Sequence, residues 1–190
     1  MRMSKWAHGM ARAGLGALGA CVLSTPLWAA DAEQAVWTEK TVHFVYTGFT
    51  THYSCDGLRE QVRDMLLQLG ARKEDLKVRE SGCIRLAGGP EPFPGLEIKM
   101  YVLTPVAGAA SQPVVAAHWK PVNLLAHHPG LDAAGQCELF DAVKHDILPS
   151  FTVRNLDYMT SCVPHQLLPG AQRLVAEVLV TDAVPPSASP

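Results

Sequence analysis

The histidines are the side chains in this sequence whose spacing is most suited to chemistry. His43 and His52 are nine residues apart, and so are His118 and His127. Neutral imidazole binds copper, zinc or nickel, so the two matched pairs predict a transition-metal (Cu or Zn) site if the fold brings them together. No H-x-H, H-E-x-x-H or methionine-rich run accompanies them. Ordinary positions on a half-exposed strand and in loops explain the same residues without a metal.

Hydrolase chemistry is a second alternative. Ser54 lies between His52 and Asp56, so three residue types of a hydrolytic triad are close in sequence. Triad members meet in space and are seldom sequence neighbours, and no G-x-S-x-G elbow is present. Ser54 as a helix cap and Asp56 in the first helical turn account for both residues without chemistry. We therefore predict no catalytic residue and favour a role other than an enzyme.

The chain from residue 42 onward contains two related halves. Order and approximate spacing are kept between them, which predicts a duplicated supersecondary unit over residues 41–106 and 115–184. The first half contains Val42-His43-Phe44, His52, Cys55-Asp56, Gly82-Cys83 and Pro94-Gly95, and the second contains Ala117-His118-Trp119, His127, Cys137-Glu138, Ser161-Cys162 and Pro169-Gly170.

The cysteines fit this duplication. Cys55 and Cys83 are separated by 83−55 = 28 residues, and Cys137 and Cys162 by 162−137 = 25. An even number of cysteines in an exported chain indicates disulfides, so we expect one bridge in each half, Cys55–Cys83 and Cys137–Cys162. No C-x-x-C spacing supports a structural zinc site.

The N-terminal segment has the pattern of a secretory signal peptide. Arg2, Lys5 and Arg12 precede an apolar run over residues 13–24, and small residues follow at positions 29 and 30. We therefore expect residues 1–30 to be removed and the protein to be periplasmic or secreted. An alternative is a lipoprotein anchored at Cys21, because residues 18–21 resemble a lipobox, although the residues that follow are apolar.

Charge and length narrow the class of protein. Without residues 1–30 the chain has 16−3 = 13 basic and 18 acidic residues, a formal net charge of −5, and no block of like charge. This argues against binding to nucleic acid, and no membrane span is expected. Residues 31–182 suit one domain with its own core, and the Pro/Ser-rich residues 183–190 are expected to be a disordered tail.

Hydrophobic periodicity predicts a β-α-β-β order in each half. Strands are expected over residues 41–47, 76–80 and 96–102, and over 114–124, 151–158 and 173–181. Helices are expected from Ser54 to Gly70 and around residues 140–147. Both helices have one apolar face. The fold class predicted is therefore α+β, a two-layer sandwich resembling a ferredoxin-like plait with a pseudo-twofold axis. Two small domains side by side are the alternative.

This arrangement predicts an uncovered sheet face. If the helices cover one face, strand alternation places Tyr101, Leu103, Val175 and Leu179 on the other. Exposed contiguous apolar surface marks a site of association. The leading functional prediction is therefore an exported, disulfide-stabilised binding module, with a protein partner or a second copy of the chain on this face.

The stretch from Thr50 through His52 and Cys55 to Leu58, together with the paired halves, resembles a group of short exported proteins from gammaproteobacteria. The resemblance covers most of the chain after the signal peptide. It implies export and no particular activity.

Overall fold

The computed structural model describes residues 32–83, 92–108, 111–124, 137–161, 163, 165–166 and 172–182. These residues form strands and helices in a β-α-β-β order that occurs twice. The elements are β1 (Glu33–Val45), α1 (Cys55–Gln68), β2 (Lys77–Ser81), β3 (Gly95–Pro105), β4 (Val115–Asn123), α2 (Cys137–Ala142), β5 (Val153–Thr160) and β6 (Gln172–Val180). The predicted signal peptide and C-terminal tail lie outside the described residues.

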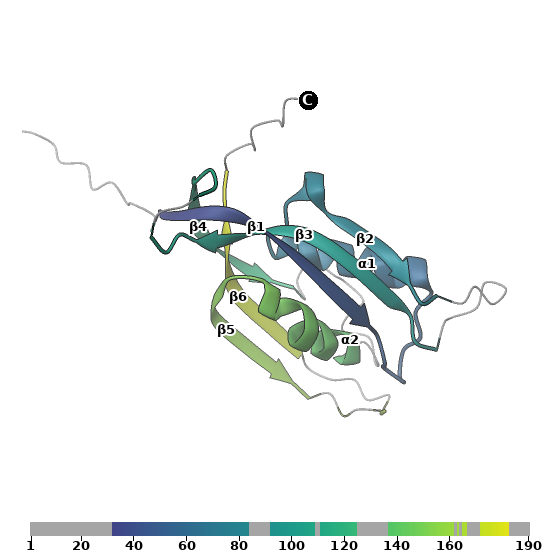
Figure 1. The fold of residues 1–190 in the computed structure, drawn as a ribbon. Helices are drawn as coiled ribbons and strands as arrows, with labels where there is room; N and C mark the ends of the chain where they lie inside the picture. Colours follow the sequence, from purple (N-terminus) through teal and green to yellow (C-terminus); the bar gives the residue numbers. More distant parts are fainter. Residues whose placement is uncertain are drawn as a thin grey trace, which may run out of the picture.

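The strands form a six-stranded sheet in the order β2-β3-β1-β4-β6-β5, and every neighbouring pair is antiparallel (Figure 1). In each half the first strand pairs with the third, and the third pairs with the second. The first two strands of a half are therefore parallel in direction but separated by the third. The halves join where Glu33–Ala35 of β1 pairs with residues 115–117 of β4.

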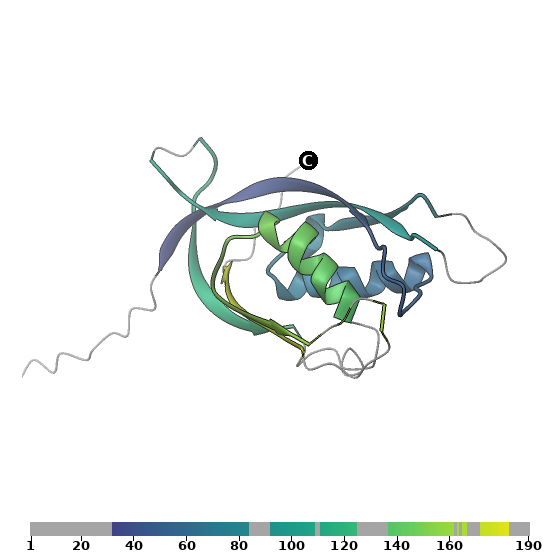
Figure 2. The same ribbon diagram turned by 90° about the horizontal axis from the view of Figure 1, so that it is seen from below.

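Both helices pack inside the curve of this sheet (Figure 2). Leu58, Val62 and Leu66 of α1 share one core with Leu139 and Phe140 of α2. The inward residues of β3 and β6 complete the same core: Leu96, Ile98, Met100, Val102, Leu174 and Val178. A shared core contradicts the alternative of two small domains side by side, and the α+β class is confirmed.

The second helix is shorter than its apolar pattern predicted. α2 ends at Ala142, and the chain continues as a π-helical turn, Val143–Ile147, and a 3-10 turn, Leu148–Ser150. Pro149 lies in the 3-10 turn, and proline cannot donate the hydrogen bond that continues an α-helix. The first strand, in contrast, starts at Glu33, eight residues earlier than its expected start at residue 41.

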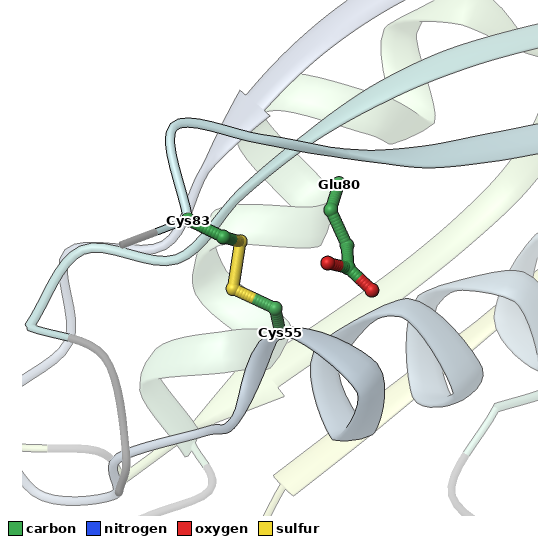
Figure 3. A group of neighbouring side chains, drawn as sticks. All are labelled: Cys55, Glu80 and Cys83. Carbon is green, nitrogen blue, oxygen red and sulfur yellow. A yellow bond between two sulfur atoms is a disulfide. The ribbon is translucent and has the colours of Figure 1, made fainter. Parts of the chain in front are cut away.

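The predicted Cys55–Cys83 disulfide is present, with the two Cα atoms 6.3 Å apart. It ties the first residue of α1 to the segment after β2 (Figure 3). Cys137 is also disulfide-bonded. Cys162 lies outside the described residues, so the Cys137–Cys162 pairing stays a prediction.

The predicted open face is wrong for two of its four residues. Leu103 is 2% exposed and Leu179 is 3% exposed. They lie with Ala35 and Ala117 in a second apolar cluster, against which Trp37, Val115 and Trp119 pack. Trp37 is the cross-strand neighbour of Leu103, and Trp119 is that of Leu179. The early start of β1 supplies Ala35 and Trp37, which the expected strand at residues 41–47 did not include. Tyr101 and Val175 remain partly exposed.

Candidate functional site

One end of the molecule collects several chain segments, and we call it the loop end. It comprises residues 46–53 after β1, Phe93 and Pro94 before β3, Val163 and His165 after β5, and Glu138 of α2. Tyr46 donates its backbone N–H to the Pro94 carbonyl at 3.0 Å, which extends the β1–β3 pairing into this region.

The Glu138 carboxylate joins three of these segments. Oε2 accepts from the backbone N–H of Phe49 at 2.7 Å, from that of Thr50 at 2.9 Å and from the Thr50 hydroxyl at 2.8 Å. Oε1 accepts from the backbone N–H of His165 at 2.9 Å. The side chain of Glu138 is only 9% exposed. A single carboxylate thus fixes the loop after β1 and the loop after β5 to the start of α2.

These donors keep the carboxylate ionised. Burial on its own raises the pKa of Glu138, but the bonds from Thr50, His165 and Phe49 together outweigh it, so the pKa lies below its usual value of 4.5. Hydrogen bonds to an ionised acceptor are about twice as strong as neutral ones. Gly48 also belongs to this packing, because an added Cβ would lie 2.7 Å from Glu138 Oε2 and 2.0 Å from the Tyr46 hydroxyl.

Two tyrosines lie beneath the loop. Tyr46 is 1% exposed and Tyr53 is 7% exposed, and their rings meet edge to face with centroids 5.0 Å apart. Neither hydroxyl has a hydrogen-bond partner among the described residues. Burial is the main cause that raises the pKa of both phenols well above 10, and the Glu138 charge adds to it; for Tyr46 the neighbouring Tyr53 contributes more than Glu138 does. Both side chains stay neutral and pack as part of the core.

Large apolar side chains of the loop end are exposed to solvent: Phe49 is 59% exposed, Phe93 55% and Val163 41%. Val45, the last residue of β1 beside this end, is 50% exposed. The Phe49 ring meets the His165 imidazole edge to face, with centroids 4.5 Å apart. The loop end therefore combines exposed apolar groups with a backbone held by a nearly buried carboxylate.

Sequence reasoning did not identify this site. The sequence comparison treated Glu138 only as the counterpart of Asp56 in the second half. Thr50, the main hydrogen-bond partner of Glu138, is 88 residues away in the sequence. Two features of the sequence lie at this site: the loop residues Gly48-Phe49-Thr50, and an acidic residue, Glu138, directly after a cysteine at a helix start. Neither pattern indicates which segment the carboxylate contacts.

Of the predicted metal-binding histidines, the structure separates His43 from His118. His43 is opposite Glu97 on β3, and His118 is opposite Val180 on β6. β1 and β4 run apart from their junction, so the two imidazoles are on the order of 30 Å apart along the sheet. His52 is exposed in the loop after β1, and His127 lies outside the described residues. His118 Nδ1 instead lies 3.7 Å from Asp182 Oδ2.

Within the described residues, one group of three potential ligands is close enough to hold an ion, and it contains no histidine. It consists of Cys55, Glu80 and Cys83, whose ligand atoms all lie within 4.8 Å of one another (Figure 3). The two sulfurs are bonded to each other. Glu80 accepts from Arg59 Nη1 at 2.6 Å. These bonds account for all three side chains without a metal.

Ser54 and Asp56, two of the residues weighed for hydrolase chemistry, have structural roles. The Ser54 hydroxyl accepts from the Gly57 backbone N–H at 3.1 Å and caps α1, as the sequence predicted. Asp56 pairs with Arg59 at 2.7 Å. The Ser54 hydroxyl is thus engaged at the helix start, where the capping interpretation placed it.

No helix in the described part of the chain is both long and apolar enough to cross a membrane. Comparisons with family models, with curated proteins and with solved structures found no match to this chain.

Proposed function

We propose that this protein is an exported, disulfide-stabilised binding module whose binding surface is the loop end. The observation that carries the proposal is Phe49, a large aromatic side chain that is 59% exposed on a backbone held by Glu138. The predicted outer sheet face is a weaker candidate, because Leu103 and Leu179 are buried there.

Burial energetics support this choice. Leaving one phenylalanine in water forgoes on the order of 1.5–3 kcal/mol of available burial, and the loop end leaves both Phe49 and Phe93 exposed. Aromatic side chains are enriched at the centres of protein interfaces. A loop already fixed by a carboxylate loses less conformational freedom when it binds, so more of the contact energy is realised as affinity.

The chemistry of the loop end favours binding over catalysis. Glu138 already accepts four hydrogen bonds, and both tyrosine hydroxyls are buried. A general base must lie within hydrogen-bond reach of a substrate proton. The Glu138 side chain is only 9% exposed and both tyrosines are buried, so none of these three groups is open to a substrate in this structure. An apolar surface of a protein partner is the ligand that best fits Phe49 and Phe93.

We also propose that the two halves are a duplication, in a register different from the one first predicted. Three correspondences support a spacing of 82 residues: Trp37 with Trp119, Cys55 with Cys137 and Arg72 with Arg154. Arg72 lies over the Trp37 ring at 5.6 Å, and Arg154 lies over the Trp119 ring at 4.4 Å. The strand order also repeats, but the spacing shortens after the helices, to 153−77 = 76 between the starts of β2 and β5 and to 162−83 = 79 between Cys83 and Cys162. A duplication with this shortening still favours a second bridge, Cys137–Cys162. His118 then corresponds to Val36 instead of His43.

Photo-crosslinking tests the binding role. A photoreactive side chain is placed at position 49 or 93, and at position 114 as the control. Val114 is 44% exposed but lies beside the opposite end of β1, on the order of 30 Å away. We expect the same discrete adduct from positions 49 and 93 in exporting cells and none from 114. Phe49→Ala should also reduce the adduct formed from position 93.

Equal labelling at all three positions, or no adduct at 49 and 93, would contradict the proposal.

A further inference from the structure

We infer that Glu138 is a proton-controlled latch that holds the loop end in its binding shape when ionised and releases both loops when protonated. This inference concerns the regulation of the proposed binding surface and rests on the proposed function. Its structural basis is the set of donors around one nearly buried carboxylate.

The arrangement of donors makes the latch sensitive to a single proton. Oε2 faces two backbone N–H groups and the Thr50 hydroxyl, while Oε1 faces the backbone N–H of His165. An ionised carboxylate is an acceptor only, so every one of these contacts is favourable. A proton on Oε2 would compete with its three donors, and a proton on either oxygen removes the negative charge that strengthens all four hydrogen bonds. Protonation therefore weakens the contacts with both loops.

Four other titratable groups face Glu138. His165 Nδ1, from the loop after β5, lies 3.8 Å from Oε1. Tyr46 and Tyr53, from the loop after β1, and Asp141, from α2, interact with it electrostatically. A protonated His165 would strengthen the latch, the phenols stay neutral in acid, and protonation of Asp141 removes a repulsion. None of these changes opens the latch as the pH falls, so Glu138 is the group whose protonation is expected to open it.

The direction of the pKa shift sets the pH range of release. The pKa of Glu138 lies below 4.5 in the folded protein, so the ionised carboxylate contributes its full stabilisation of the loop end at any pH above the ordinary pKa of 4.5. The contribution is lost as the pH falls through the lowered pKa. The latch is thus closed at neutral pH and opens in strong acid.

Backbone amide NMR of the full mature chain tests the latch directly. We expect the amide protons of Phe49, Thr50 and His165 to shift together in one transition with a midpoint below pH 4.5. Glu138→Gln should abolish that transition and speed exchange of the Phe49 and Thr50 amides about tenfold at neutral pH. Glu177→Gln is the control, because Glu177 also has a lowered pKa from Arg154 but lies on β6. It should leave the three amides unchanged.

The outcomes separate the latch from the binding role. Amide shifts that persist in Glu138→Gln have another cause, so only the transition that this variant removes tests the latch. A latch without the loop-end adducts would overturn the proposed function and keep the inference. Amides that do not shift in acid, or that shift equally in Glu138→Gln, would overturn the latch whatever the crosslinking shows. Circular dichroism confirms that each variant is folded.

Discussion

Individual residues in this protein carry roles that their types do not predict. Tyr46 and Tyr53 are polar residues used as core, and their hydroxyls lack partners among the described residues. Glu138 is an acidic residue used as a connector between loops. In each case the role comes from burial and from the donors nearby, because the same side chain at a solvated position would only be hydrated.

Tyr46→Phe tests the unpartnered hydroxyl. Removing a buried polar group that has no partner relieves a desolvation cost of about 1–3 kcal/mol, so we expect the free energy of unfolding to be unchanged or increased. Urea denaturation at neutral pH measures the change. Tyr101→Phe is the control, since Tyr101 donates to Glu39 Oε2 at 2.6 Å and its loss should not stabilise the fold. A clear loss of stability in Tyr46→Phe would indicate a hydrogen bond to that hydroxyl.

Leu103→Lys tests the buried outer cluster. Leu103 is 2% exposed, so a lysine there would place an unpaired charge beside Trp37 and Ala35. We expect Leu103→Lys to prevent stable folding and Leu103→Ala to lower the free energy of unfolding by about 2–5 kcal/mol. Leu156→Ala, at a residue 43% exposed on β5, should change it by less than about 0.5 kcal/mol. If Leu103→Lys folds normally, the outer cluster is open to solvent.

Among the elements, α1 has specific contacts at both of its ends. Ser54 caps its first turn, Cys55 ties its first residue to the segment after β2, and Arg59 bridges to Glu80. Its C-terminal end turns at Gly70, where φ is +94° and an added Cβ would lie 3.2 Å from the Leu179 carbonyl oxygen. The helix is therefore held at both ends against different strands.

Replacing both Cys55 and Cys83 by alanine should lower the free energy of unfolding by about 3.5 kcal/mol, because the bridge closes a loop of 28 residues in the unfolded chain. Ser54→Ala, at the same end of α1, should cost only about 1 kcal/mol, since it removes one cap. Thermal unfolding under non-reducing conditions compares the two. A double-alanine loss no larger than that of the cap would show that the bridge adds little.

At the scale of the whole molecule, a curved sheet encloses both helices and the two halves meet over a short β1–β4 contact. The second apolar cluster lies at this junction and reinforces it from the outside. Cooperative unfolding is the expected consequence, because the main core contains residues from both halves.

Stability should fall in alkali because of the two buried tyrosines. The pKa of both phenols is raised in the folded state. Their contribution to the free energy of unfolding is therefore complete below the ordinary pKa of 10 and is lost as the pH rises above it. Circular dichroism between pH 9 and 12 measures the loss, and a Tyr46→Phe, Tyr53→Phe double variant should lose less stability over this range. Identical curves for the two proteins would contradict the assignment.

The sequence was sufficient for features that depend on neighbours along the chain. The α+β class, the Ser54 cap, the apolar stripe of α1 and the Cys55–Cys83 pairing all follow from local periodicity or spacing, and all are present. The early start of β1 was missed, because residues 33–40 alternate weakly and contain charged and polar residues. The second helix was predicted to be longer than it is, because the apolar pattern continues across the π-helical turn.

Tertiary structure alone decided the exposure of the sheet face and the location of the candidate site. Alternation along a strand states which residues share a face, but the curvature of the sheet decides whether that face is solvent or a second core, as at Leu103 and Leu179. The equal spacing of the histidines predicted a metal site if they met in the fold, but β1 and β4 run in opposite directions from their junction, and this separates His43 from His118. Glu138 and Thr50 are 88 residues apart, and only the folded chain brings a carboxylate to the loop it holds.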